Sequence, residues 1–138
     1  MWNVATGELL RDINVHTDTI YSISFSYDGS YFATTSKDKQ IRVINARTGE
    51  VVSQGAGHDG SKASRVTFLG TSGKMLTTGV SRSSERQIAI WDPVCVCLVK
   101  VFYSMELLRF SCVVLISDKA NNSVLIVGFE QALEVGHG

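Results

Sequence analysis

The sequence predicts an all-β protein built from repeated four-stranded antiparallel sheets, and three observations support this prediction. Apolar residues recur at a period of two, as at Tyr21, Ile23 and Phe25, which is the pattern of a half-buried strand. Short turn sequences such as YDGS and KDKQ separate these alternating segments. Helical periodicity is absent between residues 1 and 92.

A repeat relates several of these segments. WNVATGELL, which begins at Trp2, and INARTGEVV, which begins at Ile44, share the frame x-N-x-x-T-G-E at an offset of 42 residues. His16 and His58 are separated by the same 42 residues, and a Trp-Asp pair stands at 91–92. A period of ~40–45 residues with an early His and a final Trp-Asp is typical of WD-repeat propeller blades. The alternative, a generic antiparallel sandwich, does not explain the shared offset.

Each unit divides into short strands rich in β-branched and aromatic residues. In the first unit we expect TIYSISFS (19–26), YFATTS (31–36), IRVIN (41–45) and VVSQ (51–54). In the second unit we expect SRVTFLG (64–70), KMLTTGV (74–80) and QIAIWD (87–92), with a longer turn, SRSSER, before the last of these.

The predicted fold is therefore a partial WD-repeat β-propeller of about three four-stranded blades. Residues 1–14 are predicted to end a truncated blade, 15–56 and 57–101 to form two WD-repeat blades, and 102–138 to form a degraded third blade or a divergent tail. A closed ring takes ~4–8 blades. We therefore expect a fragment or a truncated product, which needs missing blades or another chain to close the propeller.

Composition and charge limit the kinds of partner and the cellular compartment that we expect for this chain. The 13 basic and 13 acidic residues cancel, so no net charge favours nucleic acid. Charged residues interrupt the apolar region 93–117, so the ~18 apolar residues of a membrane-spanning helix are not reached. The lack of a secretory leader and the odd count of three cysteines predict reduced thiols in a cytoplasmic protein.

Two sets of residues are predicted to form buried polar networks by the spacing typical of WD repeats. A buried chain of Asp, His and Thr is stable only when every member is paired, and it then fixes one geometry. These residues are therefore predicted to be structural and not catalytic. The first network has Ile44 where a Trp would stand, whereas the second keeps its Trp. The members are His16, Thr34 and Asp38 in the first unit, and His58, Thr78, Glu85 and Trp91 in the second.

No motif in the sequence indicates an enzyme. GTSGK at 70–74 lacks the spacing of a phosphate-binding loop and is better interpreted as a hairpin turn. Cys95 and Cys97 are too close together for a zinc clamp, and the three histidines form no metal-ligand pattern. We therefore expect no catalytic residues, no metal and no cofactor.

Basic residues near two turns are the candidate partner-binding residues, because propeller loops are rigidly held interaction surfaces. They are Lys37, Lys39, Arg42, Arg82 and Arg86. If the blades are neighbours, both turns lie on the same rim. The alternative is that these are ordinary solvated charges, offset by Asp38 and Glu85.

Two long segments resemble the coronins. They are HTDTIYSISFSYDGSYFATTSKDKQIRVINARTGEVV (16–52) and FLGTSGKMLTTGVSRSSERQIAIWDP (68–93). The most specific pieces are SKDKQIRVI, ARTGEVV and TTGVSRSSERQIAIWD. The resemblance covers roughly residues 1–93. It implies that the propeller binds filamentous actin in the cytoplasm, takes part in organising the actin cytoskeleton and engages actin-regulatory proteins. The alternatives are a generic WD-repeat scaffold and a truncated product without function.

Overall fold

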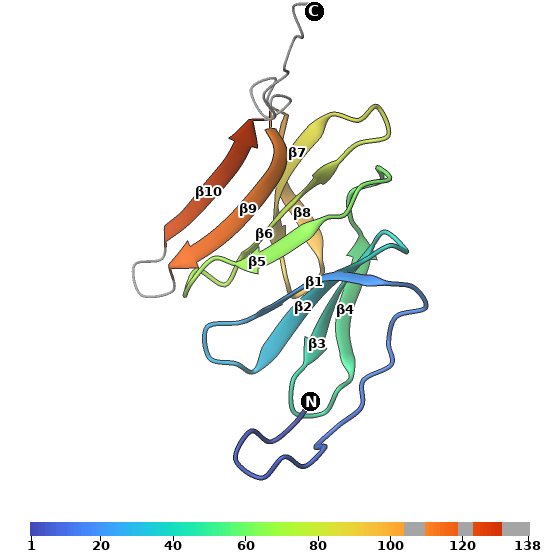
Figure 1. Cartoon of the computed structure of the whole chain (residues 1–138), viewed down its shortest axis with the longest axis vertical. Helices are drawn as coiled ribbons and strands as arrows, with labels where there is room; N and C mark the ends of the chain where they lie inside the picture. The colour runs from blue at the N-terminus through green and yellow to red at the C-terminus, as the bar shows by residue number, and fades with distance from the viewer. Residues whose placement is uncertain (104–109, 119–122, 131–138) are drawn as a thin grey trace, which may run out of the picture.

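The computed structural model describes residues 1–103, 110–118 and 123–130, and every regular element in these ranges is a β-strand (Figure 1). The strands form three antiparallel sheets, so the predicted all-β class is confirmed. The first sheet, which we call blade 1, has the order β1-β2-β3-β4. Its strands are β1 (Ile20–Phe25), β2 (Tyr31–Ser36), β3 (Gln40–Asn45) and β4 (Val51–Ala56).

The second sheet, blade 2, repeats this meander in the order β5-β6-β7-β8. Its strands are β5 (Arg65–Phe68), β6 (Met75–Val80), β7 (Arg86–Asp92) and β8 (Cys97–Tyr103). The third sheet is the pair β9 (Phe110–Asp118) and β10 (Ser123–Glu130). Residues 104–109, 119–122 and 131–138 of the predicted third blade or tail lie outside the described residues.

The first strands of the three sheets follow one another in space. β1 contacts β5, and β5 in turn contacts β9 (Figure 1). The remaining strands of each blade extend outward from this row. A series of antiparallel meanders with adjoining first strands is the arrangement of blades in a propeller.

The main core lies between blades 1 and 2. The strand period of two directs alternate side chains of β2 and β3 to opposite faces of blade 1. One face carries Ala33, Ile41 and Val43 into a cluster with Met75, Trp91 and other buried residues of blade 2. The other face buries Phe32, Ile44 and Ala46, against which Ile13 and Val15 pack. Both faces of blade 1 are therefore apolar, as expected for a blade between two neighbours.

The T-G-E repeat of the sequence corresponds to a repeated hairpin. Trp2 pairs with Leu9, Ile44 with Val51, and Trp91 with Leu98, and the partners are seven residues apart in each case. The first two hairpins also share the turn bond, in which the Gly7 and Gly49 amides donate to the carbonyls of Asn3 and Asn45, both at 2.8 Å. Both glycines have positive φ, which glycine adopts without steric cost.

Two further features bear on the predicted compartment and on the prediction that no helix spans a membrane. A disulfide joins Cys95, in the turn between β7 and β8, to Cys97, the first residue of β8, so the prediction of reduced thiols is wrong for this pair. The two residues flank Val96 in a tight turn, which brings their side chains together. Among the described residues, no helix has the length and apolar character needed to cross a membrane.

Candidate functional site

Three connecting segments meet at one edge of the two blades: the β2–β3 turn (37–39), the start of the β4–β5 loop (57–60) and the β6–β7 turn (81–85). Two backbone hydrogen bonds hold them together. The Gly57 amide donates to the Lys39 carbonyl of blade 1 at 2.8 Å, and the Gly60 amide donates to the Val80 carbonyl of blade 2 at 2.8 Å. We call this the basic edge, because it carries most of the predicted partner-binding residues.

In blade 1, a polar network runs inward from the basic edge. His16 Nε2 lies 2.6 Å from Thr34 Oγ1. Nη1 of Arg42 lies 2.7 Å from both His16 Nδ1 and Asp38 Oδ2. The structure thus brings together the three predicted members and adds Arg42, which was predicted to bind a partner. The guanidinium supplies a donor in a blade where Ile44 lacks the indole N–H.

Blade 2 contains the equivalent network with different partners. Thr77 Oγ1 accepts the indole N–H of Trp91 at 2.7 Å and lies 2.8 Å from His58 Nε2. His58 Nδ1 lies 2.9 Å from Gln87 Oε1. Gly79 lies beneath the imidazole, and a Cβ on this residue would overlap the ring. His58, Thr77 and Trp91 are all buried.

The predicted members Thr78 and Glu85 do not join this network, which is a correction. Thr78 is buried, but successive residues of a strand point to opposite faces, so its hydroxyl faces away from His58. Glu85 is exposed in the β6–β7 turn, where Ser83 Oγ donates to its carboxylate at 3.2 Å. The partners Thr34 and Arg42 are eight residues apart, whereas Thr77 and Ala89 are twelve apart. The longer turn displaces Glu85, and Gln87 takes its place.

The hydrogen-bond partners fix which nitrogen of each imidazole carries its proton. Arg42 can only donate, so His16 Nδ1 accepts and its Nε2–H donates to Thr34. In blade 2 the Gln87 oxygen can only accept, so His58 Nδ1–H donates and its Nε2 accepts from the Thr77 hydroxyl. The two histidines occupy equivalent places but hold opposite tautomers.

Burial and neighbouring charge set the ionisation of these groups. Burial, followed by the Arg42 cation, lowers the pKa of His16, and the nearby Asp38 only partly opposes this shift. Burial also lowers the pKa of His58, although Gln87 and Asp59 act in the opposite direction. Burial by itself would raise the pKa of Asp38, but hydrogen bonds from the Gln40 amide and Arg42 outweigh it and keep the pKa low. Both imidazoles are therefore neutral near pH 7.

The other predicted binding residues lie on or beside the basic edge. Lys37, Lys39 and Arg82 are exposed, whereas Arg86 is partly buried at the start of β7. Lys39 Nζ donates to the Asp59 carbonyl at 2.8 Å, and Arg82 Nε lies 3.4 Å from the Asp59 carboxylate. The structure therefore brings basic side chains of both blades to one loop residue, Asp59. The sequence analysis did not identify Asp59 as part of the site. The signal for it in the sequence was that the pair His58-Asp59 stands in the position of His16 and Asp18.

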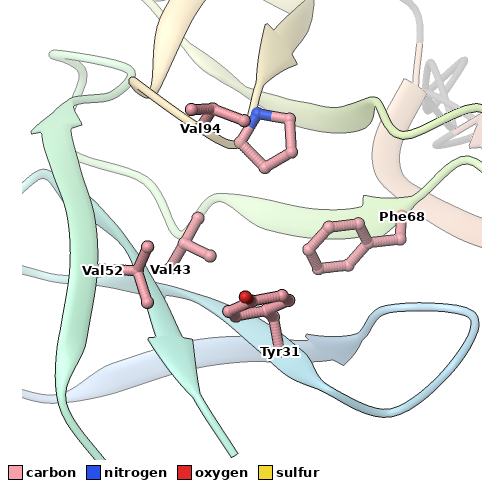
Figure 2. Close-up of a pocket in the computed structure, with 6 residues that line it drawn as sticks. Tyr31, Val43, Val52, Phe68 and Val94 are labelled. Atoms are coloured by element: carbon pink, nitrogen blue, oxygen red, sulfur yellow. The ribbon is translucent and has the colours of Figure 1, made fainter.

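An apolar cavity of about 250 Å³ lies between the blades, and Figure 2 shows the rings of Tyr31 and Phe68 facing it. Its lining residues are Tyr31, Val43, Val52, Phe68, Pro93 and Val94. Val52 and Val94 are exposed. Within the described ranges, no group of three or more His, Cys, Asp or Glu residues could hold a metal ion.

The repeated meanders, the hairpin register and the His–Thr–Trp network of blade 2 define a WD-repeat protein. The WD domain, G-beta repeat, family matches residues 7–45. The structure of U3-55K superposes on 75% of this chain and 32% of its own length with a TM-score of 0.63 at 19% identity, which supports the fold alone. The chain is thus part of a WD-repeat β-propeller.

The more specific relatives are coronins. A coronin-like protein of Saccharomyces cerevisiae is 49% identical over 92 residues, which cover 67% of this chain and 14% of the relative. Human Coronin-2A is 45% identical over 97 residues, covering 67% of this chain and 18% of the relative. The WD40 domain of Toxoplasma gondii coronin superposes on 92% of this chain and 33% of its own length with a TM-score of 0.82 at 29% identity. The resemblance is confirmed: over two thirds of its length, this chain is a coronin homologue.

The structural likeness extends further along the chain than the sequence likeness, because it covers 92% of the residues against 67%. At the same time, the chain spans only 14–18% of the length of the curated relatives just described. It corresponds to about one third of the coronin WD40 domain.

Proposed function

We propose that this chain supplies part of an actin-filament-binding surface of a coronin-like WD-repeat protein and acts in the cytoplasm on the actin cytoskeleton. The resemblance to coronins implies this partner, with actin-regulatory proteins as further partners. The observation that carries the proposal is the convergence of basic side chains from two blades on one edge.

The basic edge has the properties of a recognition surface for an acidic partner such as the actin filament. Lys37, Lys39 and Arg82 are exposed on turns that rigid strands hold in place. Although Asp38, Asp59 and Glu85 lie on the same three segments, exposed Lys and Arg side chains held at one edge can each meet a carboxylate of the partner and orient it on contact. Arg42 is excluded from this surface because it is bound to His16 and Asp38.

The proposal is tested by co-sedimentation of the purified chain with actin filaments over a series of salt concentrations. We expect salt-sensitive pelleting, because contacts between exposed charges weaken as the Debye length shortens. Lys37→Gln and Arg82→Gln should each weaken binding about two- to fivefold, since exposed ion pairs contribute up to ~1 kcal/mol.

Arg47→Gln is the matched control. Arg47 is also exposed, but it lies in the β3–β4 turn at the other end of β3 from the basic edge. Its substitution should leave pelleting unchanged. Equal losses in all three variants, or no pelleting by a folded and monomeric chain, would contradict the proposal. Analytical ultracentrifugation of the chain alone establishes that the pelleted protein is not self-associated.

A further inference from the structure

Asp59 joins the two blades of the basic edge through two different atoms. Its backbone carbonyl accepts a hydrogen bond from Lys39 Nζ of blade 1 at 2.8 Å. Its carboxylate lies 3.4 Å from Nε of Arg82 of blade 2. A single acidic residue of the chain therefore sits between the two basic groups that an acidic partner would contact.

The loop that carries Asp59 is held in place on both sides. The Gly57 amide is bonded to blade 1 and the Gly60 amide to blade 2. Gly60 lies so close to the Val80 and Ser81 carbonyls that any side chain there would overlap them. His58, the neighbour of Asp59, is anchored by Thr77 and Gln87. The spacing between Lys39 and Arg82 is thus set by a preorganised loop, which lowers the entropic cost of binding.

The carboxylate contact is exchangeable. The side chain of Arg82 is 86% exposed and that of Asp59 is 53% exposed. Exposed ion pairs contribute little to stability, because water solvates both charges and salt screens them. A carboxylate from another molecule can therefore replace that of Asp59 at Arg82 without unfolding the loop, while the Lys39 contact to the backbone carbonyl is unaffected.

We propose that Arg82, with Lys39 held on the backbone carbonyl of the same loop residue, forms a carboxylate-binding site that the Asp59 carboxylate fills in the free protein and that an aspartate or glutamate side chain of an acidic protein partner takes over. The Asp59 carboxylate then competes with the partner's carboxylate for Arg82. This competition weakens binding to acidic surfaces in general and makes the binding selective for partners with a well-placed carboxylate. The inference deepens the proposed function and rests on it for the identity of the partner, but its chemistry can be tested without actin.

The decisive variant is Asp59→Asn. It keeps the size of the side chain and the backbone carbonyl that binds Lys39, and it removes only the competing charge. Binding is measured with two probes: actin filaments by co-sedimentation, and a short poly-L-glutamate peptide by NMR titration of the Arg82 Nε–Hε signal. We expect the variant to bind both probes about two- to fivefold more tightly than the parent chain, and the gain should shrink as salt rises.

Glu50→Gln is the matched control, because Glu50 is exposed in the β3–β4 turn and its substitution changes the net charge equally. It should leave the affinity within about 1.5-fold of the parent. The double variant Asp59→Asn/Arg82→Gln should lose the gain. Equal gains in Asp59→Asn and Glu50→Gln, or no gain for the peptide, would overturn the inference. Tighter peptide binding without actin binding by either protein would uphold the site and refute the actin proposal.

Discussion

The valine variant of Thr77 tests the hydrogen-bond network of blade 2 most directly. Thr77 is fully buried, and its hydroxyl accepts the Trp91 indole N–H and donates to His58 Nε2. Valine has nearly the same shape, so packing is retained while both polar partners lose their bond. A buried polar group left unsatisfied costs about 1–3 kcal/mol. With two groups affected, we expect Thr77→Val to lower the free energy of unfolding by about 2–6 kcal/mol.

The neighbouring residue provides the control. Thr78 is also buried, but its side chain points to the face of β6 opposite to His58 and Trp91, outside this network. Thr78→Val should therefore change the free energy of unfolding by less than about 1 kcal/mol. Urea unfolding followed by tryptophan fluorescence measures both variants, because Trp91 is 6% exposed and moves into water, whereas Trp2 is already 65% exposed. A loss in Thr78→Val equal to that in Thr77→Val would refute the assignment.

Three further outcomes follow from the networks. Because burial lowers the pKa of His58 below its usual 6.5, the unfolded chain takes up a proton first. The free energy of unfolding should thus be level above about pH 7 and fall as pH drops through 6.5, and a flat profile in urea titrations would contradict this. Gly79→Ala should destabilise by at least ~2 kcal/mol because its methyl overlaps the His58 ring, whereas Gly29→Ala, with open space but positive φ, should lose about 1 kcal/mol in the same assay. Arg42→Met should raise the pKa of His16 in an NMR titration, because it removes a cation that lowers it; an unchanged or lower pKa would argue against the Arg42 contact.

The hairpins and the repeat could be predicted from the sequence because they depend on few and nearby residues. The T-G-E turn needs an Asn side chain that accepts backbone amides and a glycine with positive φ, as at Asn45 and Gly49. The partner of His58 could not be predicted in the same way. It depends on strand register, and the longer β6–β7 turn breaks the constant offset between the blades. One residue of error exchanges Thr77 for Thr78 and reverses the face of the sheet.

That Arg42 belongs to the polar network of blade 1 could not be predicted from the sequence for a different reason. A basic residue beside a turn is usually solvated, and its type alone does not tell which way a long side chain extends. In the structure it reaches His16 and Asp38 in the blade where Ile44 offers no donor. Asp59 was missed because its partners come from turns that are 20 residues or more away in sequence. Only the packing of the two blades brings them together.

The opposite tautomers of His16 and His58 bear on how such repeats can diverge. The His–Thr pair is the same in both blades, whereas the residues that differ, Arg42 in one blade and Gln87 with Trp91 in the other, belong to the third strand. An imidazole can donate from either nitrogen, so it accepts a third strand that offers a donor or one that offers an acceptor. The choice of tautomer thus reverses the direction of the hydrogen-bond chain. It runs from Arg42 through His16 to Thr34 in blade 1, and from Thr77 through His58 to Gln87 in blade 2. A third strand can therefore carry either kind of polar residue while the His–Thr pair stays the same.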